Sequence, residues 1–353
     1  MTTTPGGVSR LAYDAPMADT ADTTIPQRTL GRTGREVSAV GLGTWQIGGD
    51  WGEVSETEAF AVLDAAAEAG ITFFDTADVY GDGRSEQLIG RWRAQNPGWQ
   101  GTVATKMIRR APAPSLEHAT LENFRAWTDR SRANLGVDTL DLVQLHCPET
   151  PVYSSDFVYD ALDTLVEEGA MAAYGVSVET VEEALTAIAR PGVATVQIIL
   201  NAFRQKPLEQ VLPAARQAGV GIIARVPLAS GLLSGRYTAE TIFPENDHRS
   251  FNRRGEAFDV GETFAGIDYA TGIEAAAEFS ALAAEHRLEP AAAAIAWILQ
   301  QPAVSSVIPG ARSAQQARSN AQAGQLPQLP ASFLNGVEQI YRERIKPEVH
   351  HRW

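Results

Sequence analysis

Five apolar segments of this chain each end in a polar or ionisable residue. The segments ITFFD, GTVATK, LDLVQLH, YGVS and GIIAR end in Asp75, Lys106, His146, Ser177 and Arg225. Taken singly, each has an ordinary structural explanation, because strand-end acids cap helices and structural ion pairs are common. If the segments are parallel strands, however, their carboxyl ends meet at one rim, where polar side chains gather for catalysis.

Tyr80 follows Asp75 by five residues and could supply a proton to such a site. A phenol has an ordinary pKa of about 10, so it can protonate an alkoxide but needs assistance at neutral pH. A neighbouring Lys106 ammonium would lower that pKa, and Asp75 could pair with Lys106 and hold it. His146 could orient a carbonyl oxygen from the other side. These four residues indicate protonation of an oxygen while hydride arrives at carbon, whereas Asp78 is expected to be an ordinary loop residue.

Short apolar runs alternate with longer amphipathic runs from Arg28 onward. Eight such pairs in about 320 residues predict a closed (β/α)8 TIM barrel. We expect an N-terminal hairpin in RTLGRTGREVS, a long insertion after strand 7 at about 229–269 and a C-terminal helix in ASFLNGVEQIYRERI. The alternative is a doubly wound open sheet. Against it, GLGTWQ has Gln46 where the third glycine of the dinucleotide-binding fingerprint belongs.

Composition narrows the class of protein further. The formal net charge of −14 argues against a nucleic-acid or anionic-membrane surface, and no apolar run has the length of a membrane span. The single cysteine, Cys147, excludes an intrachain disulfide framework and suits a cytoplasmic protein. Residues 1–27 are expected to be a mobile tail, and 28–353 one domain, as a monomer or homo-oligomer. The histidines form no HExxH pattern, so no metal is expected.

Six motifs, in this order, resemble the aldo-keto reductases from residue 28 to about residue 323: FDTADVYG, ATK, LVQLHCPE, YGVSVE, PLASGLLSGRY and VIPGARSAQQARSN. The resemblance implies a (β/α)8 barrel that binds NADPH, or less often NADH, without a Rossmann domain. It also implies a catalytic tetrad of Asp75, Tyr80, Lys106 and His146. Arg225 stands where many members stack an aromatic ring on the nicotinamide, which resembles the bacterial and potassium-channel-β branches.

The same resemblance implies cofactor-binding residues along the chain. At the nicotinamide end these are Thr44, Trp45, Asp75, Ser177, Gln197 and Arg225. In the loop over the pyrophosphate they are Leu228, Ser230, Gly231, Leu232 and Arg236. At the adenosine end they are Gly310, Arg312, Ser313, Gln316 and Asn320.

Two departures from the family pattern affect the cofactor prediction. Val178 replaces the asparagine that often follows the serine, so one amide contact is lost. Gly310 and Gln316 stand where many members carry a lysine and an arginine, so a preference for the 2′-phosphate of NADPH rests on Arg312 and Ser313. The expected substrate pocket suits an aldehyde, a ketone or a sugar-like carbonyl, and is formed by Trp45, Trp51, Tyr80 and His146.

The predicted function is NADPH-dependent reduction of an aldehyde or ketone. One alternative is a redox-sensing or regulatory subunit that binds the cofactor with little turnover, as the channel-β branch suggests. Another is a barrel lyase that uses Lys106 as a Schiff base and needs no nicotinamide. Asn201 and Arg204 could contact substrate or the insertion, or could have a purely structural role. The final HHRW could dock on the barrel or on another subunit.

Overall fold

The computed structural model describes residues 24–48 and 54–353, so Trp51 and most of the predicted tail lie outside the described residues. An antiparallel hairpin comes first, with strands β1 (Gln27–Thr29) and β2 (Glu36–Ser38). Arg28 on β1 donates hydrogen bonds to the backbone oxygens of Val304 and Leu299. The predicted hairpin is therefore present, and it covers the N-terminal end of the strands that follow.

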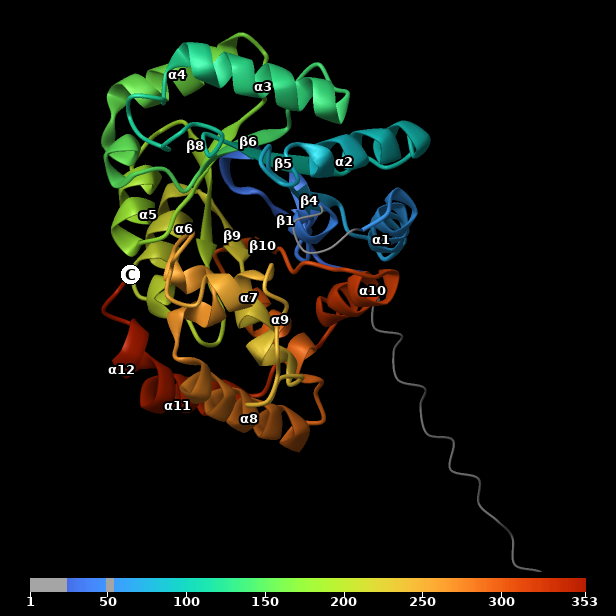
Figure 1. Ribbon diagram of the computed structural model, residues 1–353, viewed down its shortest axis with the longest axis vertical. Helices are drawn as coiled ribbons and strands as arrows, with labels where there is room; N and C mark the ends of the chain where they lie inside the picture. The colour runs from blue at the N-terminus through green and yellow to red at the C-terminus, as the bar shows by residue number, and fades with distance from the viewer. Residues whose placement is uncertain (1–23, 49–53) are drawn as a thin grey trace, which may run out of the picture.

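Eight parallel strands form one sheet in which chain neighbours pair. They are β3 (Leu42–Gly43), β4 (Phe73–Asp75), β5 (Thr102–Met107), β6 (Leu142–His146), β7 (Tyr174–Ser177), β8 (Val193–Ile199), β9 (Gly221–Arg225) and β10 (Val304–Val307). Parallel bridges join Val40 to Val307 and Gly43 to Gly310, so the first and last strands meet (Figure 1). The sheet curls into a barrel, and the open doubly wound alternative is wrong.

The first barrel strand is shorter than VSAVGLGTW predicts. Only Leu42 and Gly43 form a regular ladder with β4, and Val40 makes an isolated bridge to Val307. Ser38 belongs to the hairpin and exchanges hydrogen bonds with Thr72. The other strands are buried along their whole length, and all seven residues of β8 are inaccessible to solvent. Burial on both faces explains why their sequences read as uninterrupted apolar runs.

Helices surround the barrel in the order that hydrophobic periodicity predicts. They are α1 (Glu56–Glu68), α2 (Arg84–Gln95), α3 (Leu121–Leu135), α4 (Asp156–Glu167), α5 (Val181–Ile188), α6 (Val211–Ala218), α9 (Pro290–Leu299) and α10 (Ala314–Ala323). A capping box of Ser55 and Glu58 starts α1, and left-handed Gly70 (φ 87°) follows its end. The run from Ser115 predicts an earlier start for α3, but the Thr120 side chain accepts from the Asn123 backbone N–H and begins the helix there.

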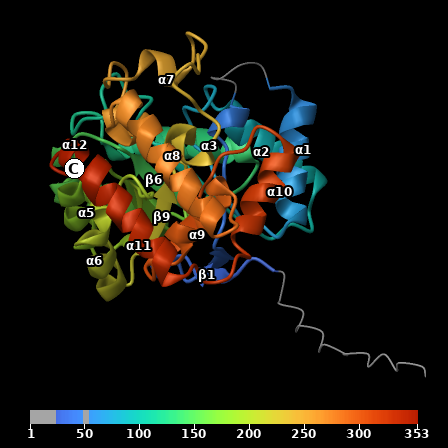
Figure 2. The same cartoon turned by 90° about the horizontal axis from the view of Figure 1, so that it is seen from below.

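The insertion after β9 lies at the C-terminal end of the barrel. It contains short 3₁₀ turns and α7 (His248–Phe251), and it leads into α8 (Tyr269–Glu285). Helix α11 (Ala331–Ile340) packs on α8, and a short π-helical segment joins it to α12 (Lys346–Val349) (Figures 1 and 2). Beyond α12, Arg352 donates to the Gly266 backbone oxygen, so the last residues dock on the insertion. No helix among the described residues is long and apolar enough to cross a membrane.

Candidate active site

The barrel brings the four predicted catalytic side chains together. Asp75 and His146 end β4 and β6, Lys106 is the penultimate residue of β5, and Tyr80 lies on the turn after β4. The Lys106 ammonium lies 2.5 Å from Asp75 Oδ1 and 5.2 Å from the centre of the Tyr80 ring. The rings of Tyr80 and His146 meet edge to face with their centres 5.9 Å apart. Neighbouring strands of a parallel barrel thus deliver these groups to one rim.

The Lys106–Asp75 ion pair is buried and held by further hydrogen bonds. Lys106 also donates to the Thr76 backbone oxygen at 2.8 Å. Asp75 Oδ2 accepts from the amide nitrogens of Gln197 at 2.7 Å and Gln144 at 3.2 Å. A buried ion pair needs such partners, because both charges lose their water. Burial lowers the pKa of Lys106, but Asp75 and Tyr80 outweigh it and raise the pKa above its ordinary value, so the ammonium persists.

The Tyr80 phenol is protonated at neutral pH. Burial raises its pKa, Lys106 lowers it and Asp75 raises it again, and the pKa ends above its ordinary value. Lys106 lowers the pKa of the Tyr80 phenol, as the sequence predicts. The net pKa is nevertheless raised, because burial, which the sequence does not reveal, raises it by more than Lys106 lowers it. The protonated phenol is the form that can donate to an oxygen.

His146 carries a neutral imidazole. Burial first, and then the positive charges of Arg109, Lys106 and Arg225, hold its pKa well below the ordinary value. Its Nδ1 atom has no hydrogen-bond partner within residues 24–48 and 54–353. This Nδ1 atom is itself buried, although the His146 residue lines the cleft described below.

A cleft of about 510 Å³ runs from these residues to the N-terminus of α10. Trp45, Tyr80 and His146 line one end, and Arg312 lines the other. Fourteen of the predicted cofactor-binding residues line this cleft: Thr44, Trp45, Asp75, Ser177, Gln197, Arg225, Leu228, Ser230, Gly231, Arg236, Gly310, Arg312, Gln316 and Asn320. Sites with many lining residues from separate segments are typical of extended ligands.

Two predicted cofactor residues lie elsewhere. Leu232 is buried against Gly272 of α8, so it packs the loop after β9 against that helix and does not line the cleft. The Ser313 hydroxyl accepts from the Gln316 backbone N–H and caps α10. Lining residues that the sequence did not reveal include Gln46, Tyr237, His248 and Glu262. The last three lie in the insertion; Tyr237 ends the motif PLASGLLSGRY, whereas no motif marks His248 or Glu262.

The loop after β9 adopts backbone conformations that ordinary residues avoid. Val226, Ala229 and Ser230 have φ of 54°, 47° and 55°, and Gly231 has φ of 100°. A β-branched residue such as Val226 rarely accepts positive φ, and strained backbone of this kind clusters at ligand sites. The strain lies in the loop that the family pattern assigns to the pyrophosphate.

The far end of the cleft is built around a helix N-terminus. Gln316 Oε1 accepts from the Arg312 backbone N–H at 2.7 Å, and Asn320 donates to the Gly310 backbone oxygen at 3.1 Å. These bonds fix the segment before α10. A Cβ atom added at Gly310 would lie 2.2 Å from the end of the Gln46 side chain, which would have to move. A helix N-terminus beside an arginine favours an anionic ligand group.

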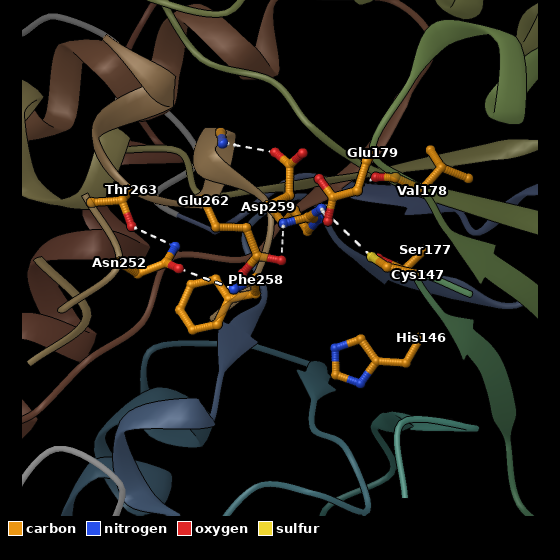
Figure 3. A network of polar contacts seen from close by, with 12 residues as sticks. His146, Cys147, Ser177, Val178, Glu179, Asn252, Phe258, Asp259, Glu262 and Thr263 are labelled. Carbon is orange, nitrogen blue, oxygen red and sulfur yellow. Dashed lines mark hydrogen bonds and ion pairs between the residues drawn. The ribbon is translucent and has the colours of Figure 1, made fainter. Parts of the chain in front are cut away.

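Beside His146 lies a partly buried cluster of two acids and two arginines, which we call the rim ionic cluster: Arg109, Glu179, Arg225 and Glu262. Arg225 lies 2.8 Å from Glu179 Oε1 and 3.3 Å from Glu262 Oε1, and Arg109 lies 3.4 Å from Glu262 Oε1. Figure 3 shows the two acids close together, with His146 below them in this view.

Cys147 approaches the rim ionic cluster, and its sulfur and the two carboxylates have a spacing that could hold a metal ion. Their chemistry does not suit a cation, because two guanidinium groups already occupy the acids. Burial also raises the pKa of the Cys147 thiol to about 12, which leaves it protonated. Its sulfur lies 3.3 Å from the Ser177 hydroxyl, as expected of a packed thiol.

Comparison with known proteins agrees with this geometry. The aldo-keto reductase yakc of Schizosaccharomyces pombe, whose name specifies NADP(+), is 28% identical over 84% of this chain and 86% of its own. A probable voltage-gated potassium channel subunit beta of Arabidopsis thaliana is 27% identical over 90% of this chain and 97% of its own. The solved glycerol dehydrogenase of Gluconobacter oxydans aligns with a TM-score of 0.73 and 28% identity over 92% of this chain and 97% of its own.

The family model described as "Aldo/keto reductase family" matches residues 39–342. That range begins at the first barrel strand and ends beyond α11, so it includes the whole cleft. This chain belongs to the aldo-keto reductase family of oxidoreductases.

Proposed function

We propose that this protein reduces an aldehyde or ketone to an alcohol with NADPH, and that Tyr80 is the proton donor. One observation carries the proposal: a protonated phenol, a buried ammonium–carboxylate pair and a neutral imidazole meet at one end of a long cleft. NADPH, when bound, supplies the hydride.

The protein groups then have distinct tasks. The Tyr80 hydroxyl and the His146 imidazole hold the carbonyl oxygen, and the Tyr80 proton moves to that oxygen as the carbon is reduced. The Lys106 ammonium stabilises the phenolate that remains, because a nearby positive charge favours the charged form. Asp75 keeps Lys106 in place, and solvent returns a proton to Tyr80 after release of the alcohol. Positioned general acids contribute about 10² to 10⁴ in rate.

The residues of the cleft fit the cofactor that this function needs. The proposed nicotinamide end is lined by Thr44, Ser177 and Arg225, and the strained loop at 226–231 would cover the pyrophosphate. Arg312 and the N-terminus of α10 would receive the adenosine end. The yakc protein, whose name specifies NADP(+), supports the choice of NADPH.

The competing functions make different demands. A Schiff-base lyase needs the free amine of Lys106, but this amine is ion-paired and its pKa is raised. A regulatory subunit needs the cofactor without fast turnover, and the complete set of proton-transfer groups argues for turnover. Two observations favour the regulatory alternative: the name of the potassium channel relative, and Arg225 at the position where many family members have an aromatic residue.

The experiment compares wild type with Tyr80→Phe, which removes one hydroxyl and keeps the ring against Trp45. NADPH and NADH are titrated by fluorescence, and NADPH oxidation is followed with a panel of aldehydes, ketones and sugar-like carbonyls. We expect unchanged NADPH binding and a kcat about 10² or more below wild type, since only proton donation is lost. Full activity of Tyr80→Phe would refute the mechanism, and absence of any cofactor binding would refute the function.

A further inference from the structure

Arg109 links the catalytic histidine to the insertion. It follows β5 by two residues, after Ile108 has turned the backbone with φ of 86°. Its Nε atom donates a hydrogen bond of 3.1 Å to the backbone oxygen of His146. Its Nη2 atom lies 3.4 Å from Glu262 Oε1. One side chain therefore holds the peptide that carries His146 and, at the same time, an acid of the insertion.

The backbone at His146 needs such support, because the strand leaves regular geometry there. Cys147 has φ of 46°, a conformation that costs a non-glycine residue free energy. The Cys147 N–H donates to the Ser177 backbone oxygen at 3.1 Å. The peptide between His146 and Cys147 is thus held from β7 on one side and from Arg109 on the other.

Glu262 holds Arg109 in turn and ties it to the loop of the cleft. Its carboxylate contacts both Arg109 and Arg225. Its backbone oxygen accepts from the Ser230 hydroxyl at 2.9 Å, and the same hydroxyl accepts from the Phe264 backbone N–H at 3.1 Å. Burial raises the pKa of Glu262, but Arg225 and Arg109 outweigh it and lower the pKa to about 2, so the carboxylate is ionised.

The charges around His146 come from several elements. Lys106 of β5, Arg109 after β5 and Arg225 of β9 are the cations, and all three lower the pKa of the imidazole. Glu179 and Glu262 neutralise Arg225, while Asp75 neutralises Lys106. Tyr80 packs on the ring from the loop after β4. Glu262 therefore holds in place two of the three cations that keep His146 neutral.

We propose that Arg109, held by Glu262 of the insertion, is a positioning residue for His146, so that the insertion fixes the orientation of the imidazole that faces the substrate. The importance of this orientation for turnover rests on the function proposed above. The contacts at His146 themselves do not depend on it, which allows a test that is independent of turnover.

The test uses Arg109→Gln, Arg109→Lys and Glu262→Gln in the full chain, with Glu256→Gln as the matched control. Glu256 is an exposed acid of the same insertion. For each variant, kcat and KM are measured at saturating NADPH, and the Kd of NADPH is measured by fluorescence. Proton NMR follows the His146 imidazole through a pH titration, and His146→Asn identifies its signal.

We expect Arg109→Gln to lower kcat about 10-fold or more, because small displacements of catalytic groups are costly, while the Kd of NADPH changes less than about 2-fold. The His146 imidazole signal should shift, and its pKa should rise because one repelling charge is gone. Glu262→Gln should shift the same signal and lower kcat less, since Arg109 keeps its bond to His146. Arg109→Lys should recover part of kcat, and the control should match wild type.

The proposal is overturned if Arg109→Gln and Glu262→Gln lower only the melting temperature, with kcat and the His146 signal as in wild type. If Arg109→Gln does not fold, the kcat and the His146 imidazole signal of Glu262→Gln test the proposal instead. Failure of the proposed function looks different: wild type itself would then show no NADPH-dependent turnover with any carbonyl substrate, while the imidazole signal would still report whether Arg109 positions the ring.

Discussion

At the scale of single residues, Asp78 is a buried acid close in sequence to Tyr80 that the proposed mechanism does not use. The residue is fully buried, and no ion pair of its side chain occurs in the described part of the chain. Burial, and then the negative charge of Glu86, raise its pKa to about 7, although Arg110 and Arg130 act in the opposite direction. As an ordinary loop residue, which the sequence predicts, Asp78 contributes an unfavourable charge to the folded state.

This gives a prediction for stability as a function of pH. The folded-state pKa of Asp78 lies above its ordinary value, so its contribution to stability is fully present below about pH 4 and is lost as pH rises to about 7. Within that window the loss is about 1.4 kcal/mol per pH unit. Asp78→Asn cannot ionise, so its melting temperature should exceed that of wild type at pH 8, and the difference should shrink toward pH 5. A constant difference across this range would contradict the assignment.

The residues that could be predicted are those at strand ends. Asp75, Lys106 and His146 each close an apolar run, and Tyr80 follows within one turn, so their meeting follows from the barrel alone. The position of Gln144 near the site could also have been predicted, although less directly, because it lies two residues before His146 on the same face of the strand. The position of Glu262 could not have been predicted from the sequence, because its approach to Arg109 depends on the path of a long insertion.

At the scale of elements, the insertion is fastened to the barrel by Arg204 and Trp353. The Arg204 guanidinium lies 3.8 Å from the centre of the Trp353 ring, and it also donates to the Glu179 backbone oxygen. Gly261 and Gly266 pack so closely that added Cβ atoms would lie 1.9 Å from Arg204 and 2.4 Å from Trp353, respectively. Among the roles that the sequence left open for Arg204, the structure supports a contact with the insertion, because the side chain packs against Gly261 and Trp353.

We therefore expect Trp353→Ala to loosen the insertion while the barrel remains folded. A buried cation–π contact contributes roughly 2 kcal/mol, so local opening of the insertion should become about 30-fold more frequent. Limited proteolysis should therefore cut within residues 236–262 up to about 30-fold faster than in wild type. His351→Ala, at an exposed neighbouring residue, should not change the rate. Equal cleavage of Trp353→Ala and wild type would show that this contact does not hold the insertion.

The regular helices follow from periodicity and capping residues, whereas the conformation of the insertion does not. Thr180 and Glu183 form a capping box at α5, a pattern that the sequence displays directly. In the insertion, Phe264 and Ala265 have φ of 53° and 56°, values that tertiary contacts impose against local preference. Such segments cannot be derived from local sequence alone.

At the scale of the whole molecule, a strongly acidic chain carries a locally basic end of its cleft. The formal net charge is −14, yet Arg236, Arg249 and Arg312 all line the cleft. Net charge governs long-range attraction, whereas a bound phosphate responds to the groups within a few ångströms. Composition therefore argues against polyanionic partners without arguing against a phosphorylated cofactor.

We predict that Arg312→Ala weakens NADPH binding about 10-fold or more and leaves NADH binding nearly unchanged, because an arginine contacts a phosphate by strong charge-assisted hydrogen bonds. The measurement is the Kd of each cofactor by fluorescence, for wild type and for Arg318→Ala, an exposed arginine of α10 that forms an ion pair with Glu68. If Arg312→Ala had the same ratio of the NADH Kd to the NADPH Kd as wild type, a residue other than Arg312 would be responsible for the preference for NADPH.

The most direct test of the account is the fate of hydrogen during a single turnover. Enzyme saturated with NADPH that carries deuterium at both positions of the nicotinamide C4 is mixed with a carbonyl substrate, and the alcohol is analysed by mass spectrometry. If NADPH supplies the hydride, we expect one deuterium at the carbinol carbon with wild type. If Tyr80 is the proton donor, Tyr80→Phe should form the same product at a rate about 10² or more below wild type, with unchanged cofactor binding. An alcohol without deuterium, or an equal rate in Tyr80→Phe, would contradict it.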